Sequence, residues 1–215
     1  MKLYSGPVSV FGAKTEIAAL EKGLDLEIEH VPFTFENFYD PKPDKTLAIN
    51  PKGEVPYLED GDFTLFDSTL ICEFFEEIEP SPALWPEDIQ RRAQARLWEL
   101  QADEIYFGDI RMLMPARRKE QTREEIKHVK ARISAFQSKL DQQLVGRHYI
   151  ADEYSYADIA FFCSSFFASF LGHRPIEELQ YFDAWRLRMR ERKPVQTVLG
   201  KMSDLLNLNG INATL

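Results

Sequence analysis

The segment Asn50-Pro51-Lys52-Gly53-Glu54-Val55-Pro56-Tyr57-Leu58, with Asp67-Ser68 soon after it, decides how this chain is interpreted. Proline brings no N–H to a strand ladder, so a Val55-Pro56 step at the start of a strand is unusual. A cis bond there would turn the backbone and free its polar groups to pair with a short peptide. Asp67-Ser68 predicts a helix start, where exposed backbone N–H groups attract a carboxylate. The two motifs together predict a site for a small peptide with an amine and carboxylates.

The pattern around this segment predicts one compact α/β unit over residues 1–79. Alternating apolar residues indicate strands, apolar residues at helical spacing indicate helices, and Asp60-Gly61 is a strong hairpin signal. In chain order, the predicted elements are a strand at 2–5, a helix from Ser9 to Lys22, a strand at 26–33, a short helix at 44–49, strands on either side of Asp60-Gly61, and a helix at 68–78.

The rest of the chain has a different character. Residues 80–88 contain three prolines within a few positions and predict a linker, because proline cannot stand in a helix interior. Residues 89–215 are helical in pattern with no convincing strand. Ser155 and Asp158 form a pair similar to a capping box, which predicts a helix start at that point. The sequence therefore predicts an α/β unit followed by an all-helical one.

Composition excludes several classes of function. The net charge of −9 and the pI near 5.1 argue against general nucleic-acid binding. The two cysteines, Cys72 and Cys163, lie in apolar helical runs, so neither a disulfide framework nor a thiolate metal site is expected. No apolar run is long enough to span a bilayer, and the chain passes from Met1 straight into a strand pattern without a signal peptide. We expect a cytoplasmic protein without a metal or a membrane anchor.

These motifs resemble those of the cytosolic glutathione transferases. The resemblance covers nearly the whole chain and is carried by residues 50–56, by Phe66-Asp67-Ser68 with Ile71, by the proline linker and by the Ser155–Asp158 box. It implies a thioredoxin-like glutathione-binding domain at 1–79, a linker at 80–88 and an all-helical domain at 89–215. It also implies a homodimer, a role in detoxification, and glutathione, γ-Glu-Cys-Gly, as the cosubstrate.

The resemblance assigns roles to particular residues. Val55 would pair its backbone with the cysteinyl part of glutathione, and Pro56 would be the cis proline that holds this geometry. Asp67 and Ser68 would bind the γ-glutamyl end, and Lys42 the glycyl carboxylate. Glu54 also falls at the glycyl end, where a carboxylate repels the ligand unless it is paired. Simpler interpretations stay open, because Asp67-Ser68 could merely cap a helix and Lys42 could be a solvated loop charge.

Activation of the glutathione thiol is the central chemical requirement. Lowering a thiol pKa of about 8.5 to about 6.5 takes roughly 2.7 kcal/mol. A helix N-terminus supplies about 0.3–1 kcal/mol, and a hydroxyl donating to the charged sulfur about 1.5–3 kcal/mol. Ser9 offers both, and Gly6-Pro7-Val8-Ser9 resembles the motif of serine-type transferases. Tyr4 and Ser5 remain alternatives, because other classes use a tyrosine at the end of the first strand.

The sequence identifies the second substrate less clearly than it identifies glutathione. In this fold it lies between the first-helix loop and the fourth helix, and an aromatic lining suits a hydrophobic, aromatic electrophile. The candidates for this pocket are Val10, Phe11, Phe35, Tyr106, Phe107, Arg111 and Met114. Two other functions stay open. One is glutathione-dependent cleavage of a β-aryl ether, because residues 52–56 and 71–74 look similar to β-etherases; the other is a non-catalytic binding or scaffold protein.

Overall fold

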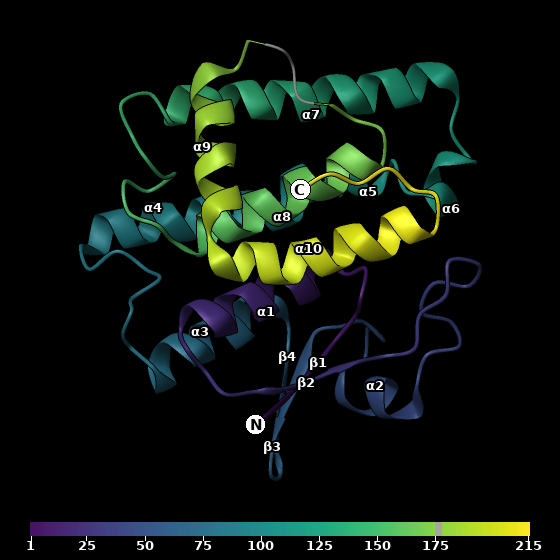
Figure 1. The fold of residues 1–215 in the computed structure, drawn as a ribbon, viewed down its shortest axis with the longest axis vertical. Coiled ribbons are helices and arrows are strands. Elements are labelled where there is room, and N and C mark those ends of the chain that lie inside the picture. The colour runs from purple at the N-terminus through teal and green to yellow at the C-terminus, as the bar shows by residue number, and fades with distance from the viewer. Residues whose placement is uncertain (175–177) are drawn as a thin grey trace.

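A computed structural model describes residues 1–174 and 178–215 of the chain (Figure 1). Its first part contains the predicted elements in the predicted order. The strand expected at 26–33 is shorter, because only four of its residues pair with the first strand. The elements are β1 (Lys2–Ser5), α1 (Val10–Glu21), β2 (Glu27–His30), α2 (Asp44–Ile49), β3 (Tyr57–Asp60), β4 (Phe63–Phe66) and α3 (Ser68–Ile78).

The four strands form one mixed sheet in the order β2-β1-β3-β4. β1 is parallel to β2 and antiparallel to β3, and β3 and β4 form the predicted hairpin. Leu3 and Leu58 are paired in register and fully buried in the main core. On the other face, Tyr4 and Tyr57 stack with their ring centroids 4.5 Å apart. The alternation along each strand thus separates a helix-covered face from a smaller aromatic cluster.

Beyond residues 79–88, which form neither helix nor strand, every named element is helical. One segment is a π-helix, which continues α4 directly into α5. The sequence did not predict it, because one wide turn hardly alters apolar spacing. The elements are α4 (Ile89–Leu100), η1 (Gln101–Tyr106), α5 (Phe107–Arg111), α6 (Pro115–Arg118), α7 (Arg123–Gln143), α8 (Tyr156–Phe170), α9 (Gln180–Glu191) and α10 (Lys193–Leu208).

Helix α8 is the centre of the helical part and packs against α1, α4, η1, α5 and α9. Its start confirms the predicted capping pair, since the Ser155 N–H donates to the Asp158 carboxylate at 3.0 Å. Asp158 also accepts from the Ile150 N–H at 3.0 Å and the Trp185 indole N–H at 2.8 Å. This buried carboxylate therefore ties three segments together at the start of the central helix.

Helix α1 joins the two parts of the molecule. It packs on α3 within the first part and on α8 and α10 of the second, as Figure 1 shows. Both cysteines are buried in this common core, and burial raises the pKa of each thiol. None of the described helices combines the length and the apolarity needed to cross a membrane.

Candidate functional site

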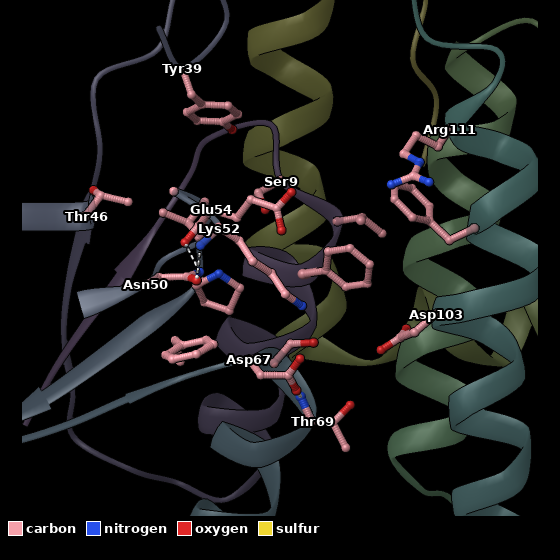
Figure 2. Close-up of a pocket in the computed structure, with 18 of the residues that line it drawn as sticks. Ser9, Tyr39, Thr46, Asn50, Lys52, Glu54, Asp67, Thr69, Asp103 and Arg111 are labelled. Atoms are coloured by element: carbon pink, nitrogen blue, oxygen red, sulfur yellow. Dashed lines mark hydrogen bonds between the residues drawn. The ribbon is translucent and has the colours of Figure 1, made fainter. Parts of the chain in front are cut away.

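A cavity of about 720 Å³ opens between the two parts of the molecule (Figure 2). One wall comes from the loops around the sheet and from the start of α3, and we call it the sheet-side wall. Its lining residues lie within 39–56 and 66–70. The opposite wall, the helix-side wall, comes from α4, η1, α5 and the residues just after them, between Glu99 and Met114. The start of α1 lies between the two walls.

The sheet-side wall contains the motif of residues 50–56. Asn50 caps α2 and holds the turn that follows: its side chain donates to the Glu54 carbonyl at 2.7 Å and accepts from the Lys52 N–H at 3.0 Å. Gly53 has a φ of +62°, which disfavours any side chain. The Val55-Pro56 bond is cis, as proposed from the sequence. Val55 and Pro56, which follow this turn, both line the cavity.

The start of α3 forms the lower end of the same wall. Asp67 is the N-cap, and its carboxylate accepts from the backbone N–H groups of Thr69 at 3.0 Å and Leu70 at 3.3 Å. Its φ of +83° is rare for a residue with a side chain, and such backbone conformations concentrate at functional sites. Asp67 and Ser68 both line the cavity. The Asp67 carboxylate and the N-terminus of α3 thus lie side by side. The first can bind the ammonium of a ligand and the second its carboxylate.

A buried ammonium connects this end to the helix-side wall. Lys14, on α1, is 1% exposed and donates to the hydroxyls of Ser68 and Thr69 at 3.3 and 3.0 Å. The same ammonium contacts the carboxylates of Glu99 and, at 2.6 Å, Asp103. Their charges raise the pKa of Lys14 against the opposing effect of its burial, so it is charged at neutral pH. Nothing in the sequence marked Lys14, which lies among the apolar residues of α1.

Ser9 is the N-cap of α1 and lies at the middle of the cavity. Its hydroxyl oxygen accepts from the Gly12 N–H at 3.0 Å, which leaves the hydroxyl hydrogen able to donate to another group. The side chain is 9% exposed. Ser9 therefore presents an O–H donor at the positive end of a helix dipole, in the cavity that Val55 and Pro56 also line (Figure 2).

The two alternative hydroxyls lie elsewhere. Tyr4 packs on the far face of the sheet, where its oxygen accepts from the Lys45 ammonium. Ser5 is fully buried and donates to the Glu16 carboxylate at 2.5 Å. Neither residue lines the cavity.

Tyr39 is a cavity residue that the sequence analysis missed. Its hydroxyl oxygen accepts from the Val8 N–H at 3.1 Å, and burial raises its pKa. Tyr39 is therefore a neutral phenol that keeps a hydrogen to donate. It lies in an irregular loop where neither periodicity nor a turn signal singles it out, so only the three-dimensional structure identifies it.

The glycyl-end candidates, Lys42 and Glu54, both line the sheet-side wall. The Lys42 ammonium lies 5.7 Å from the centre of the Tyr39 ring and 4.0 Å from the Asp40 carboxylate. Glu54 is exposed, and within the described part of the chain its carboxylate makes no ion pair. The positive charges of Lys42 and Lys52 thus share this end of the cavity with one free carboxylate.

The predicted electrophile residues divide into two groups. Phe11 and Phe107 meet edge to face with ring centroids 5.1 Å apart, and Phe107 packs in the same way on Phe167 at 6.1 Å. These rings form an apolar floor for the cavity. The predicted residues that line it are Val10, Phe11, Phe107, Arg111 and Met114.

Tyr106 and Phe35 are corrections to the sequence-based prediction, because neither lines the cavity. Tyr106 is 1% exposed and faces the helical core, where its hydroxyl pairs with Gln137 at 3.0 Å and Ser165 at 3.3 Å. Tyr106 directly precedes Phe107 in the chain, but the two side chains lie on different faces of the helical run. Phe35 packs edge to face on Phe33, with centroids 5.1 Å apart, and against the core.

Comparison with known proteins identifies the family. Residues 3–83 match the family model described as "Glutathione S-transferase, N-terminal domain", and residues 103–193 match "Glutathione S-transferase, C-terminal domain". Glutathione S-transferase 1 of Dianthus caryophyllus is 31% identical over 182 residues, which cover 80% of this chain and 78% of the relative. The chain belongs to the glutathione S-transferase family. The expected fold, the enzyme class of that family and glutathione as the family's cosubstrate are thereby confirmed.

Other relatives match over shorter stretches. The matches span about half the length of a Coxiella burnetii stringent starvation protein A homolog, which is 28% identical over 113 residues, and 41% of protein LigF of a Sphingobium species, which is 35% identical over 109 residues. They cover 53% and 49% of this chain.

Solved structures of glutathione transferases have the same architecture. A Pseudomonas putida glutathione transferase, solved with one glutathione disulfide per subunit, is 25% identical with a TM-score of 0.77, over 92% of this chain and 90% of that one. The beta-etherase LigF of Sphingobium shares the fold with a TM-score of 0.75 at 24% identity, over 93% and 98% of the two chains.

Proposed function

We propose that this glutathione S-transferase binds glutathione along the sheet-side wall and activates its thiol at Ser9 for attack on a hydrophobic, aromatic electrophile. The observation that carries the proposal is that one cavity holds three features: the Ser9 hydroxyl, the Val55-Pro56 backbone and the Asp67-Ser68 helix start. In this arrangement Val55 pairs with the cysteinyl backbone. Asp67 and Ser68 receive the γ-glutamyl ammonium and carboxylate, and Lys42 the glycyl carboxylate.

The chemistry follows from the charge that develops on sulfur. The Ser9 O–H donates to the thiolate, and the first turn of α1 adds its dipole, which together can supply the roughly 2.7 kcal/mol that a two-unit fall in thiol pKa requires. The thiol proton leaves to solvent. With a chlorinated nitroarene, the thiolate forms a carbon–sulfur bond and chloride departs with the electron pair of the carbon–chlorine bond.

Ser9→Ala tests this assignment with 1-chloro-2,4-dinitrobenzene as the electrophile. We expect kcat/KM to fall by about 10- to 100-fold, since one hydrogen bond to a charged sulfur is lost. Glutathione affinity, measured by calorimetry, should change little. Ser9→Thr keeps a hydroxyl and should restore part of the activity.

Two further variants act as controls. Tyr39→Phe removes a second hydroxyl that lines the cavity, and Tyr4→Phe removes a hydroxyl outside the cavity. Both should keep most of the activity. Full activity in Ser9→Ala together with loss in Tyr39→Phe or Tyr4→Phe would refute the role of Ser9. Melting temperatures separate chemistry from folding, because losing a helix N-cap alone costs about 1 kcal/mol of stability.

A second candidate reaction is cleavage of a β-aryl ether by the same thiolate. It is favoured by the similarity of about half of this chain to LigF, whose structure is named as that of a beta-etherase. Attack at the carbon that bears the aryloxy group would form a carbon–sulfur bond and release a phenolate. Release of a chromogenic phenol from a model β-aryl ether, dependent on glutathione and on Ser9, is the test.

We also propose a homodimer, as expected for the family. The apolar side chains of Leu70 on α3 and of Leu97 and Leu100 on α4 are 53–55% exposed in the single chain. Exposed apolar side chains gathered on neighbouring helices are typical of an interaction surface. Light scattering coupled to size-exclusion chromatography should give twice the mass of one chain, and Leu97→Glu should reduce it.

A further inference from the structure

We infer that the electrophile is an aromatic acid, whose ring lies over Gly108 and whose anionic group pairs with Arg111. This inference names the substrate class for the electrophile half of the cavity, and it rests on the proposed function. It is drawn from the helix-side wall, where Figure 2 shows the Arg111 guanidinium turned toward the cavity, across from Ser9.

Among the described residues, no acidic side chain pairs with Arg111. Within residues 1–174 and 178–215, no carboxylate lies within ion-pair distance of its guanidinium. Asp109, the nearest acid along the chain, is bound to Arg132 at 2.6 Å and is not available to Arg111. Lys42 and Lys52, the cations of the opposite wall, belong to the proposed glutathione subsite. A guanidinium presents a planar fork of N–H donors that suits a carboxylate.

Gly108 leaves room for a ring beside this charge. It precedes Arg111 by three positions and lies on the same helix face, and a Cβ placed on it would meet no atom within 4 Å. Any larger residue would narrow the cavity there. The neighbouring Phe107 forms the apolar floor with Phe11 and Phe167. An aromatic ring in this slot would contact apolar carbon on one side while its anionic substituent reached Arg111.

Charge along the helix-side wall gives such a substrate one orientation. Glu99, Asp103 and Glu104 line the end next to α3, and Arg111 lines the other end, about two helical turns from Glu104. At the first end, the Lys14 ammonium is already paired with Glu99 and Asp103, whereas the Arg111 guanidinium at the second end attracts an anionic group. The overall charge of −9 gives anions no general attraction to the protein, so the selectivity is local.

The test compares two electrophiles, 4-chloro-3-nitrobenzoate and 4-chloro-3-nitrobenzamide, which differ in charge but lose the same chloride. In Arg111→Met, we expect kcat/KM for the benzoate to fall about tenfold or more, the value of one charged hydrogen bond. In the same variant, kcat/KM for the benzamide should stay within about twofold of the wild-type value, as expected for a surface substitution. Arg111→Lys should restore part of the benzoate activity. Arg118→Met, an exposed arginine outside the cavity, should change neither.

Binding of unreactive analogues keeps the two proposals apart. Calorimetry with 3-nitrobenzoate and 3-nitrobenzamide needs no catalysis. If the wild type binds the benzoate in an Arg111-dependent way but conjugates neither chlorinated compound, the Arg111 site for an aromatic acid stands and the proposed activity fails. If it conjugates 1-chloro-2,4-dinitrobenzene but the benzoate and the benzamide respond alike to Arg111→Met, the inference is overturned and the activity stands.

Discussion

The two walls of the cavity are built in different ways. The sheet-side wall is made of short backbone motifs, the Asn50 turn and the Asp67 cap, each held by hydrogen bonds to residues a few positions away. The helix-side wall is made of side chains on one continuous helical run, from Glu99 to Arg111, and on the turn that follows it to Met114. The directions of these side chains depend on the π-helical turn at 101–106. A site made of backbone groups keeps the same ligand when side chains are substituted. The specificity of a site made of side chains changes with each substitution.

The buried Lys14 cluster joins these walls, so its removal should have the largest effect. Lys14→Met leaves Glu99 and Asp103 buried without a cation, which should cost about 3–5 kcal/mol of unfolding free energy. Urea denaturation measures the loss. Lys127→Met is the matched control, because the ion pair of Lys127 with Glu124 is exposed to solvent. Its loss should cost far less unfolding free energy. Equal losses in the two variants would show that the walls are not joined at Lys14.

The acid end of the helix-side wall should make stability depend on pH. Burial raises the pKa of Asp103 to about 6, above its ordinary value of 3.8. The folded state therefore holds a proton that the unfolded state releases, and wild-type stability should fall as pH rises from about 4 to about 6. Relative to Asp103→Asn, the fall should reach about 3 kcal/mol at most. A difference that stays flat or grows with pH would contradict this pKa.

On the sheet-side wall, charge and capping can be separated at one residue. Asp67→Asn keeps a capping side chain but removes the negative charge proposed to bind the γ-glutamyl ammonium. We expect glutathione to bind about tenfold more weakly by calorimetry, with little change in melting temperature. Asp62→Asn, in the adjoining hairpin and outside the cavity, is the control. If Asp67→Asn bound glutathione as tightly as the wild type, Asp67 would act only as a helix cap.

The smallest expected effect concerns the slot in the helix-side wall. Gly108→Ala should raise the free energy of unfolding by up to about 1 kcal/mol, because alanine favours a helix and its Cβ meets no neighbour. Gly200→Ala in α10 is equally uncrowded and should give the same gain far from the cavity. A loss of stability at Gly108 alone would mean that the slot is not open.

Most of the sheet-side wall could be predicted from the sequence. The Val55-Pro56 step, the Asp67-Ser68 cap and the Asp60-Gly61 hairpin are local, since each is decided by residue types within a few positions. The Ser155–Asp158 box was predicted for the same reason. Of its two further donors, Ile150 lies in the loop just before the box and Trp185 in a distant helix, and neither left a local signal.

The helix-side wall was predicted only in part, for a physical reason. Apolar spacing marks a helix but not which apolar face meets a cavity and which meets the core, so Tyr106 could not be told from Phe107. Lys14 was missed because a lysine in an apolar stripe gains its partners only in the folded chain, where Ser68 and Thr69 of α3, Glu99 of α4 and Asp103 of η1 surround it. Tyr39 is placed by an irregular loop, for which no periodicity exists.

The most direct test of the account measures the pKa of the bound glutathione thiol by its ultraviolet thiolate absorbance. For the wild type we expect a pKa about two units below the ordinary value of about 8.5. In Ser9→Ala it should return upward by about one to two units while glutathione still binds. A bound thiol that titrates like free glutathione in the wild type, or a shift that survives in Ser9→Ala, would contradict the proposed role of Ser9.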